Sequence, residues 1–152
     1  MTTATVGREE AQALVERALA DDRQVFGSFF LSRLLGLSVS YEGDERCLVA
    51  FEAIPAFFNP QGTLHGGVLA TALDISMGHL LNRVAGPGAT LEMKVQYLAP
   101  IPAGPVLCTG SFLRRGRSIC FLQSHATIAE GKLAAHATAT WKPPADRPAT
   151  SG

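Results

Sequence analysis

One carboxylate, Asp74, lies in the middle of an apolar stretch of the chain. Residues 68 to 82 read VLATALDISMGHLLN, and small or apolar side chains fall on nearly every face of the helix that this stretch predicts. A carboxylate in an apolar interior is costly unless it is paired or hydrogen-bonded. Asp74 is therefore either part of a structural hydrogen-bond network or a group whose burial suits it to acid–base chemistry.

The segment just before this helix has the composition of a ligand-binding loop. Residues 59 to 67 read NPQGTLHGG, so three glycines lead into the start of the predicted helix. Glycine lets a substrate approach the backbone closely. The first amides of a helix lack intrahelical acceptors and lie at the positive end of the helix dipole. Such amides suit a developing oxyanion, and this favours a catalytic interpretation of Asp74.

Two helices are predicted before the first strand. The first is an amphipathic helix over 8–20. A second follows, capped by Asp21 or Asp22, in which apolar residues repeat at helical spacing: Val25, Phe26, Phe29, Phe30 and Leu34. The three phenylalanines in that repeat either pack against the sheet or line an acyl pocket, and both interpretations stay open.

Alternating apolar residues predict six strands. Two strands, near 37–41 and 47–53, come before the buried helix, and four follow it near 91–97, 106–114, 117–130 and 133–141. Arg115-Gly116 and Glu130-Gly131 are the expected turns. Short connections require antiparallel pairing of the later strands. The fold class is therefore α+β, with a sheet of about six antiparallel strands curved around one long helix.

The length and composition predict one domain with a substantial core. The chain has 152 residues, 47% of them apolar and 17% charged, and its net charge is zero. We expect a single domain over 1–142, with a helical segment over 1–34, and a flexible tail over 143–152. No basic surplus favours nucleic acid or an anionic membrane as a partner.

The three cysteines and four histidines show no metal-ligand spacing, so we expect neither a metal site nor a resident cofactor. The N-terminus has no basic region followed by an apolar run, which argues against a signal peptide. Together with the cysteine pattern, this predicts a cytoplasmic location.

The motif at the helix start resembles that of a known family. Asn59-x-x-Gly62-x-x-His65-Gly66-Gly67, with an aspartate nine positions after the histidine, is similar to the PaaI-like branch of the hotdog-fold acyl-CoA thioesterases. The resemblance covers about 35–141 and includes the layout of the last strands. It implies a helix wrapped by an antiparallel sheet, homodimers that often pair as homotetramers, and hydrolysis of an acyl-CoA at a site between subunits. Coenzyme A would be part of the substrate.

The resemblance also implies roles for individual residues. Asp74 would be the general base or the nucleophile, and Gly66 would donate its N–H to the thioester carbonyl. Asn59 would hold the water or the carbonyl, with Gln61 as an alternative for that role. Thr90 would help to place the water.

Other polar residues near these positions have expected roles as well. His65 is interpreted as a residue of the helix start rather than a base, and Gly67 as part of the substrate-binding loop. Arg114, Arg115 and Arg117 form either a solvated turn or a clamp for the phosphates of coenzyme A, for which forked guanidinium donors are suited.

The spacing of the two central residues limits how they can cooperate. Gly66 and Asp74 are eight residues apart, or about 12 Å along one helix. Both would have to lie within about 3 Å of the reacting atoms. If they share a reaction, Asp74 must come from another chain, which antiparallel helices across a two-fold axis would allow. The expectation is an obligate dimer with two identical sites.

Two other function classes use a similar fold. One is a non-catalytic acyl-CoA sensor, which would not need a lone buried carboxylate. The other is an enoyl-CoA hydratase, in which His65 and Asp74 would form the acid–base pair; the glycine spacing favours polarisation of a carbonyl instead.

Overall fold

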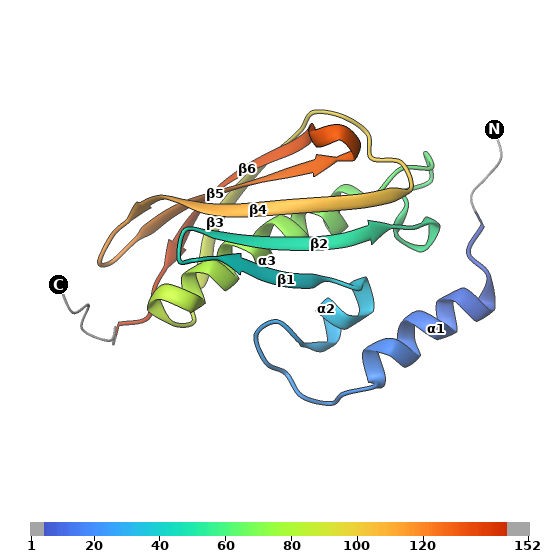
Figure 1. Ribbon diagram of the computed structural model, residues 1–152, viewed down its shortest axis with the longest axis horizontal. Helices are drawn as coiled ribbons and strands as arrows, with labels where there is room; N and C mark the ends of the chain where they lie inside the picture. The colour runs from blue at the N-terminus through green and yellow to red at the C-terminus, as the bar shows by residue number, and fades with distance from the viewer. Residues whose placement is uncertain (1–4, 146–152) are drawn as a thin grey trace.

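A six-stranded antiparallel sheet curves around one long helix in the computed structural model, which describes residues 5–145 (Figure 1). The strand order in the sheet is β1-β2-β4-β5-β6-β3. The strands are β1 (Ser38–Glu42), β2 (Arg46–Ala53), β3 (Ala89–Tyr97), β4 (Gly104–Arg115), β5 (Cys120–Ile128) and β6 (Lys132–Lys142). The predicted α+β class and hotdog arrangement are confirmed. Residues 146–152 of the expected C-terminal tail and residues 1–4 of the N-terminal segment lie outside the described residues.

The long helix, α3 (Gly66–Ala85), lies against the concave face of the sheet. It extends the predicted helix by two residues at its start and three at its end. Four of its large side chains are completely buried: Leu73, Met77, Leu80 and Leu81. Burial of this apolar surface is the main source of stability that the helix offers the fold. No helix within residues 5–145 is long and apolar enough to cross a membrane.

The backbone of strand β4 lies very close to helix α3 at Gly110. A Cβ atom at this position would lie 2.6 Å from the carbonyl oxygen of Ser76 in α3. The Ser76 hydroxyl donates to the carbonyl of Leu73 over 2.7 Å and also shares a hydrogen bond of 2.7 Å with the hydroxyl of Ser124 in β5. Helix α3 therefore sits directly on the central strands, where only a glycine leaves room for it.

The N-terminal segment differs from the prediction after its first helix. Helix α1 (Arg8–Leu19) forms as expected, but α2 covers only Phe30–Leu35. Gly27 has a φ of +84°, which a helix does not allow, and Asp21 pairs with Arg23 instead of capping a helix. The predicted second helix was therefore wrong over its first half.

One arginine explains why residues 20–29 form a loop. The guanidinium of Arg33 donates to the carbonyls of Ala18, Asp21, Arg23 and Ser28, at distances between 2.6 and 3.0 Å. Carbonyls that accept from Arg33 satisfy their hydrogen-bonding capacity without a helix. In Figure 1 this loop joins α1, the outermost element, to α2 beside β1.

The remaining connections are short. Two single-turn 3₁₀ helices cover Pro55–Phe57 and Ala129–Gly131, and the second holds the predicted Glu130-Gly131 turn. The other predicted turn is shifted, because β4 continues through Arg115 and residues 116–119 form the connection.

Strand β3 forms one edge of the sheet, and its apolar residues are only partly covered. The alternating pattern predicted one buried face, yet Leu91 and Tyr97 are each 53% exposed. Met93 and Val95 between them are half-buried. One edge of β3 pairs with β6, and no other strand within residues 5–145 pairs with its outer edge.

We expect Gly110→Ala to destabilise the protein, because the added methyl group meets the Ser76 backbone and neither can move without displacing α3. Overpacking of this kind costs about 2 kcal/mol. Urea unfolding followed by circular dichroism measures the loss. Ser111→Ala on the same strand is the control, with an expected change of about 0.5 kcal/mol or less. Equal stabilities for the two variants would contradict the close contact.

Candidate active site

Asp74 and Thr90 form the first half of the site. The Thr90 hydroxyl, at the start of β3, donates to Asp74 Oδ1 over 2.8 Å. Asp74 is half-buried rather than enclosed, although its neighbours Leu73 and Ile75 on α3 are buried. Burial raises the pKa of the Asp74 carboxyl, and the hydrogen bond from Thr90 opposes that rise. The result is a carboxylate with raised basicity that solvent can reach.

A cavity of about 490 Å³ opens beside this carboxylate. Its inner wall includes Ile75, Gly78 and His79 of α3 together with Trp141 of β6, and its outer wall is formed by Gln24, Val25, Phe26 and Phe29 of the N-terminal loop. Two of the three phenylalanines singled out from the sequence therefore line a cavity, and Phe30 does not. The sequence pattern did not predict that this loop lies beside Asp74.

The helix start forms a second half. Gly66 lines another cavity, of about 340 Å³, together with Asn59 and Gln61. The Gly67 amide donates to His65 Nδ1 over 2.9 Å, which makes His65 the cap of α3, as expected for a helix-start residue. The Gly66 amide has no acceptor within residues 5–145. It is therefore available to an oxygen that enters the cavity.

Tyr97, which the sequence did not single out, supports the same peptide segment. Its hydroxyl donates to the Gly66 carbonyl over 2.8 Å, and its ring lies 3.2 Å from where a Gly66 Cβ would be. The alternation along β3 placed Tyr97 on an apolar face, so its hydroxyl gave no separate signal.

The two amide side chains of the loop differ in their freedom. Asn59 Oδ1 accepts from the amides of Gln61 (2.9 Å) and Thr63 (3.3 Å), and Asn59 Nδ2 donates to the Thr63 hydroxyl over 3.2 Å. Asn59 therefore shapes the loop. The exposed Gln61 side chain makes no hydrogen bond within residues 5–145, so both residues remain candidates for the polar role.

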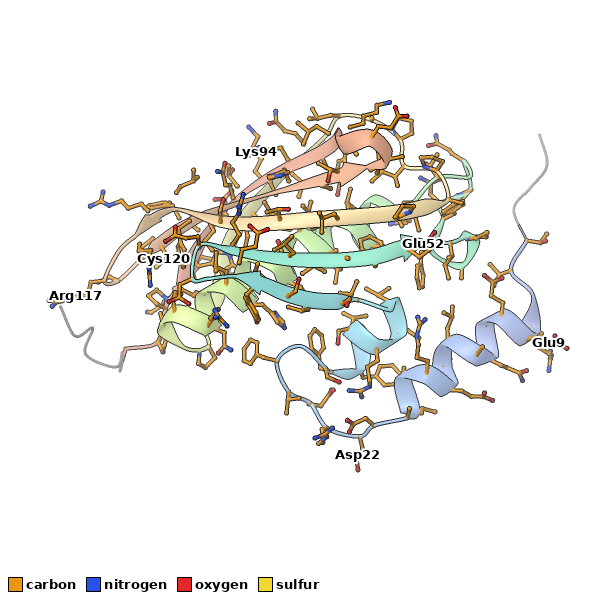
Figure 2. All side chains as sticks on the ribbon, in the orientation of Figure 1. Glu9, Asp22, Glu52, Lys94, Arg117 and Cys120 are labelled. Atoms are coloured by element: carbon orange, nitrogen blue, oxygen red, sulfur yellow. The ribbon has the colours of Figure 1, made fainter. Side chains whose placement is uncertain are left out.

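The three arginines lie apart from both cavities. Arg114 and Arg115 end β4, and Arg117 lies in the connection to β5; all three are exposed. Arg115 stacks on Phe112, with its guanidinium carbon 5.0 Å from the ring centre. Figure 2 shows Arg117 at the outer end of the hairpin.

The two halves are distant within one chain. Their central residues, Asp74 and Gly66, are eight residues apart on α3, or about 12 Å at 1.5 Å per residue. The two cavities share no lining residue.

Within residues 5–145 no cluster of three His, Cys, Asp or Glu side chains could hold a metal ion.

A family model matches the part of the chain that contains α3 and most of the strands that follow it. The family model described as the thioesterase superfamily matches residues 61–135. A Saccharolobus solfataricus protein named as a "putative esterase" is 33% identical over 98 residues, which are 63% of this chain and 70% of that protein.

Two further relatives have more specific names. Human acyl-coenzyme A thioesterase 13 is 35% identical over 81 residues, and the match covers 51% of this chain and 58% of the human protein. The solved structure of a phenylacetic acid degradation-related protein from Ralstonia eutropha is 27% identical, with a TM-score of 0.70; the match covers 85% of this chain and 98% of that one.

We expect Thr90→Val to raise the pKa of the Asp74 carboxyl above its wild-type value, because the variant keeps the shape of the side chain but removes the donor to the carboxylate. The wild-type pKa should itself lie above the ordinary value of 3.8. Carbon-13 NMR titration of the carboxyl group measures both. Thr90→Ser retains the hydroxyl and should stay close to wild type; a Val variant that titrates like the Ser variant would contradict the assignment.

Proposed function

The chain belongs to the hotdog-fold thioesterase superfamily, and on this premise we propose that it hydrolyses acyl-CoA thioesters to a free acid and coenzyme A. The observation that carries the proposal is the Asp74 carboxylate, half-buried and held by Thr90, at the wall of a largely apolar cavity. The name of the human relative supports coenzyme A as the thiol. A carboxylate with a raised pKa can accept a proton from water near neutral pH.

The residues divide the chemistry between them. The acyl carbonyl accepts a hydrogen bond from the Gly66 amide, whose N–H is free and lies at the positive end of α3. Asp74 takes a proton from a water molecule that Thr90 helps to place, and the water oxygen bonds to the carbonyl carbon. The carbon–sulfur bond then breaks, and the thiolate of coenzyme A leaves and is protonated. Direct attack of Asp74 to form an anhydride is the alternative route.

We assign the two halves of one site to two subunits. Gly66 and Asp74 cannot reach one carbonyl in the same chain, because they lie eight residues apart on α3 and line separate cavities. The outer edge of β3, with Leu91 and Tyr97 half-exposed, offers a surface on which a second copy can pair. Such a homodimer has two identical sites, and two of these dimers would make the homotetramer that the family resemblance implies.

A panel of acyl-CoAs tests the reaction itself. Release of a free thiol, followed with a thiol reagent, indicates hydrolysis. Binding without thiol release would instead indicate a sensor, and loss of enoyl absorbance a hydratase. Either result would overturn the proposed function.

We expect Asp74→Asn to lower kcat by a factor of about 10² or more, because the amide cannot accept the proton. The fold should persist. Since burial raises the pKa of Asp74, the charged form is disfavoured in the folded state at neutral pH. The variant should therefore have a melting temperature at least equal to wild type at pH 7, with any gain disappearing as the pH falls below 3.8. Near-normal turnover would reject Asp74 as the base.

Mixed dimers test the shared site. Gly66→Pro removes the amide donor at the first position of α3, where proline is compatible with a helix and with the extended conformation of His65. Refolding this variant with an equal amount of Asp74→Asn should give heterodimers in about half of the molecules, each with one intact site. Activity should rise from near zero to about a quarter of wild type.

Each variant refolded alone is the control, and circular dichroism checks that the proline variant folds despite its contact with Tyr97. No gain of activity on mixing well-folded variants would show that each chain acts by itself.

A further inference from the structure

His79 is a buried histidine that the proposed reaction does not use. It lies five positions after Asp74 on α3 and is only 4% exposed. Its Nε2 atom accepts a hydrogen bond of 2.8 Å from the Gly27 amide. An accepting Nε2 requires a neutral ring, and burial favours that state by lowering the pKa of His79.

This hydrogen bond fastens the N-terminal loop across the cavity. The Phe26 ring meets the imidazole edge to face, with centroids 5.1 Å apart, and the Phe29 ring lies 6.1 Å away. Arg33 holds the carbonyls on either side of this contact, at Arg23 and Ser28. The loop therefore has two attachments, one to α2 through Arg33 and one to α3 through His79.

The loop also forms the wall that faces the carboxylate. Val25, Phe26 and Phe29 line the same cavity as Asp74, and His79 lies at the cavity about 7.5 Å along the helix from Asp74. The family model begins at residue 61, so this wall belongs to a part of the chain that the model does not match. The selectivity that this wall gives the cavity therefore depends on residues outside the matched segment.

We propose that His79 is a positioning residue that holds loop 24–29 as the outer wall of the acyl pocket, and that the pocket selects extended, uncharged apolar acyl groups. This inference rests on the proposed thioester hydrolysis. An acyl group bound at Asp74 extends between Phe26 and α3 toward His79, and burial of its apolar surface supplies the affinity. A carboxylate on the acyl group would be repelled by Asp74, and no lysine or arginine among the described residues lines the cavity to pair with it.

A matched pair of phenylalanine variants tests the wall. Phe26 and Phe30 are both partly exposed, at 51% and 37%, but only Phe26 lines the cavity. With octanoyl-CoA and acetyl-CoA as substrates, Phe26→Ala should lower the octanoyl-to-acetyl ratio of kcat/KM about tenfold, mainly through KM. Phe30→Ala should leave this ratio within about twofold of wild type. Succinyl-CoA should be a poor substrate for the wild-type protein.

Two variants of His79 test its positioning role. Glutamine offers an oxygen that can accept from the Gly27 amide, whereas leucine fills similar space without an acceptor. His79→Leu should lose most of the octanoyl preference, and His79→Gln should restore part of it, at a temperature well below the melting point of both. Equal ratios for the two variants would show that His79 only fills space and would overturn its assignment.

The failures of the two proposals can be told apart. Thiol release from acyl-CoAs by the wild-type protein, with identical ratios for Phe26→Ala and Phe30→Ala, would overturn the pocket and leave the hydrolysis standing. No thiol release from any acyl-CoA would overturn the hydrolysis. Calorimetric binding of octanoyl-CoA to Asp74→Asn, with and without Phe26→Ala, then still tests the pocket: equal affinities would overturn it.

Discussion

The hydrogen bond between Thr90 and Asp74 is the interaction on which the site depends. It holds a carboxylate on a helix whose other side chains are mostly apolar and are covered by the sheet. Complete burial would force the carboxyl to be neutral, and full exposure would return its pKa to the ordinary range. Half-burial with one hydroxyl donor lies between these extremes. This balance depends on the position of Thr90, which is the second residue of β3 and lies just after the connection from α3.

Strand β3 links the proposed chemistry to the proposed pairing of two subunits. It carries Thr90 near its start and Tyr97 at its end, so it contacts Asp74 in one half of the site and the Gly66 peptide in the other. The same strand is the edge of the sheet and leaves apolar residues exposed. A strand that supports both halves and also offers a pairing edge would couple the geometry of the proposed two-subunit site to the proposed association of the subunits.

The N-terminal loop shows why apolar periodicity can mislead. The residues from Val25 to Leu34 repeat at helical spacing, yet the chain becomes helical only at Phe30. The spacing marked a run of apolar side chains, yet Val25, Phe26 and Phe30 stay 49%, 51% and 37% exposed. It did not record that Arg33 takes the loop carbonyls or that His79 takes the Gly27 amide. Both interactions come from residues whose positions are set by tertiary packing, and they compete successfully with the backbone bonds of a helix.

The sequence by itself determined the class of the fold and the residues most worth attention. Period-two alternation gives strands, a long apolar run gives the central helix, and a lone carboxylate with a glycine-rich helix start is visible without coordinates because each is a local pattern. Only the tertiary structure decided that Asp74 is half-buried, that Tyr97 supports Gly66, and that Phe26 and Phe29 share a cavity with the carboxylate. These relations join residues that are distant in the chain, and local propensity contains no information about which distant side chain will meet which.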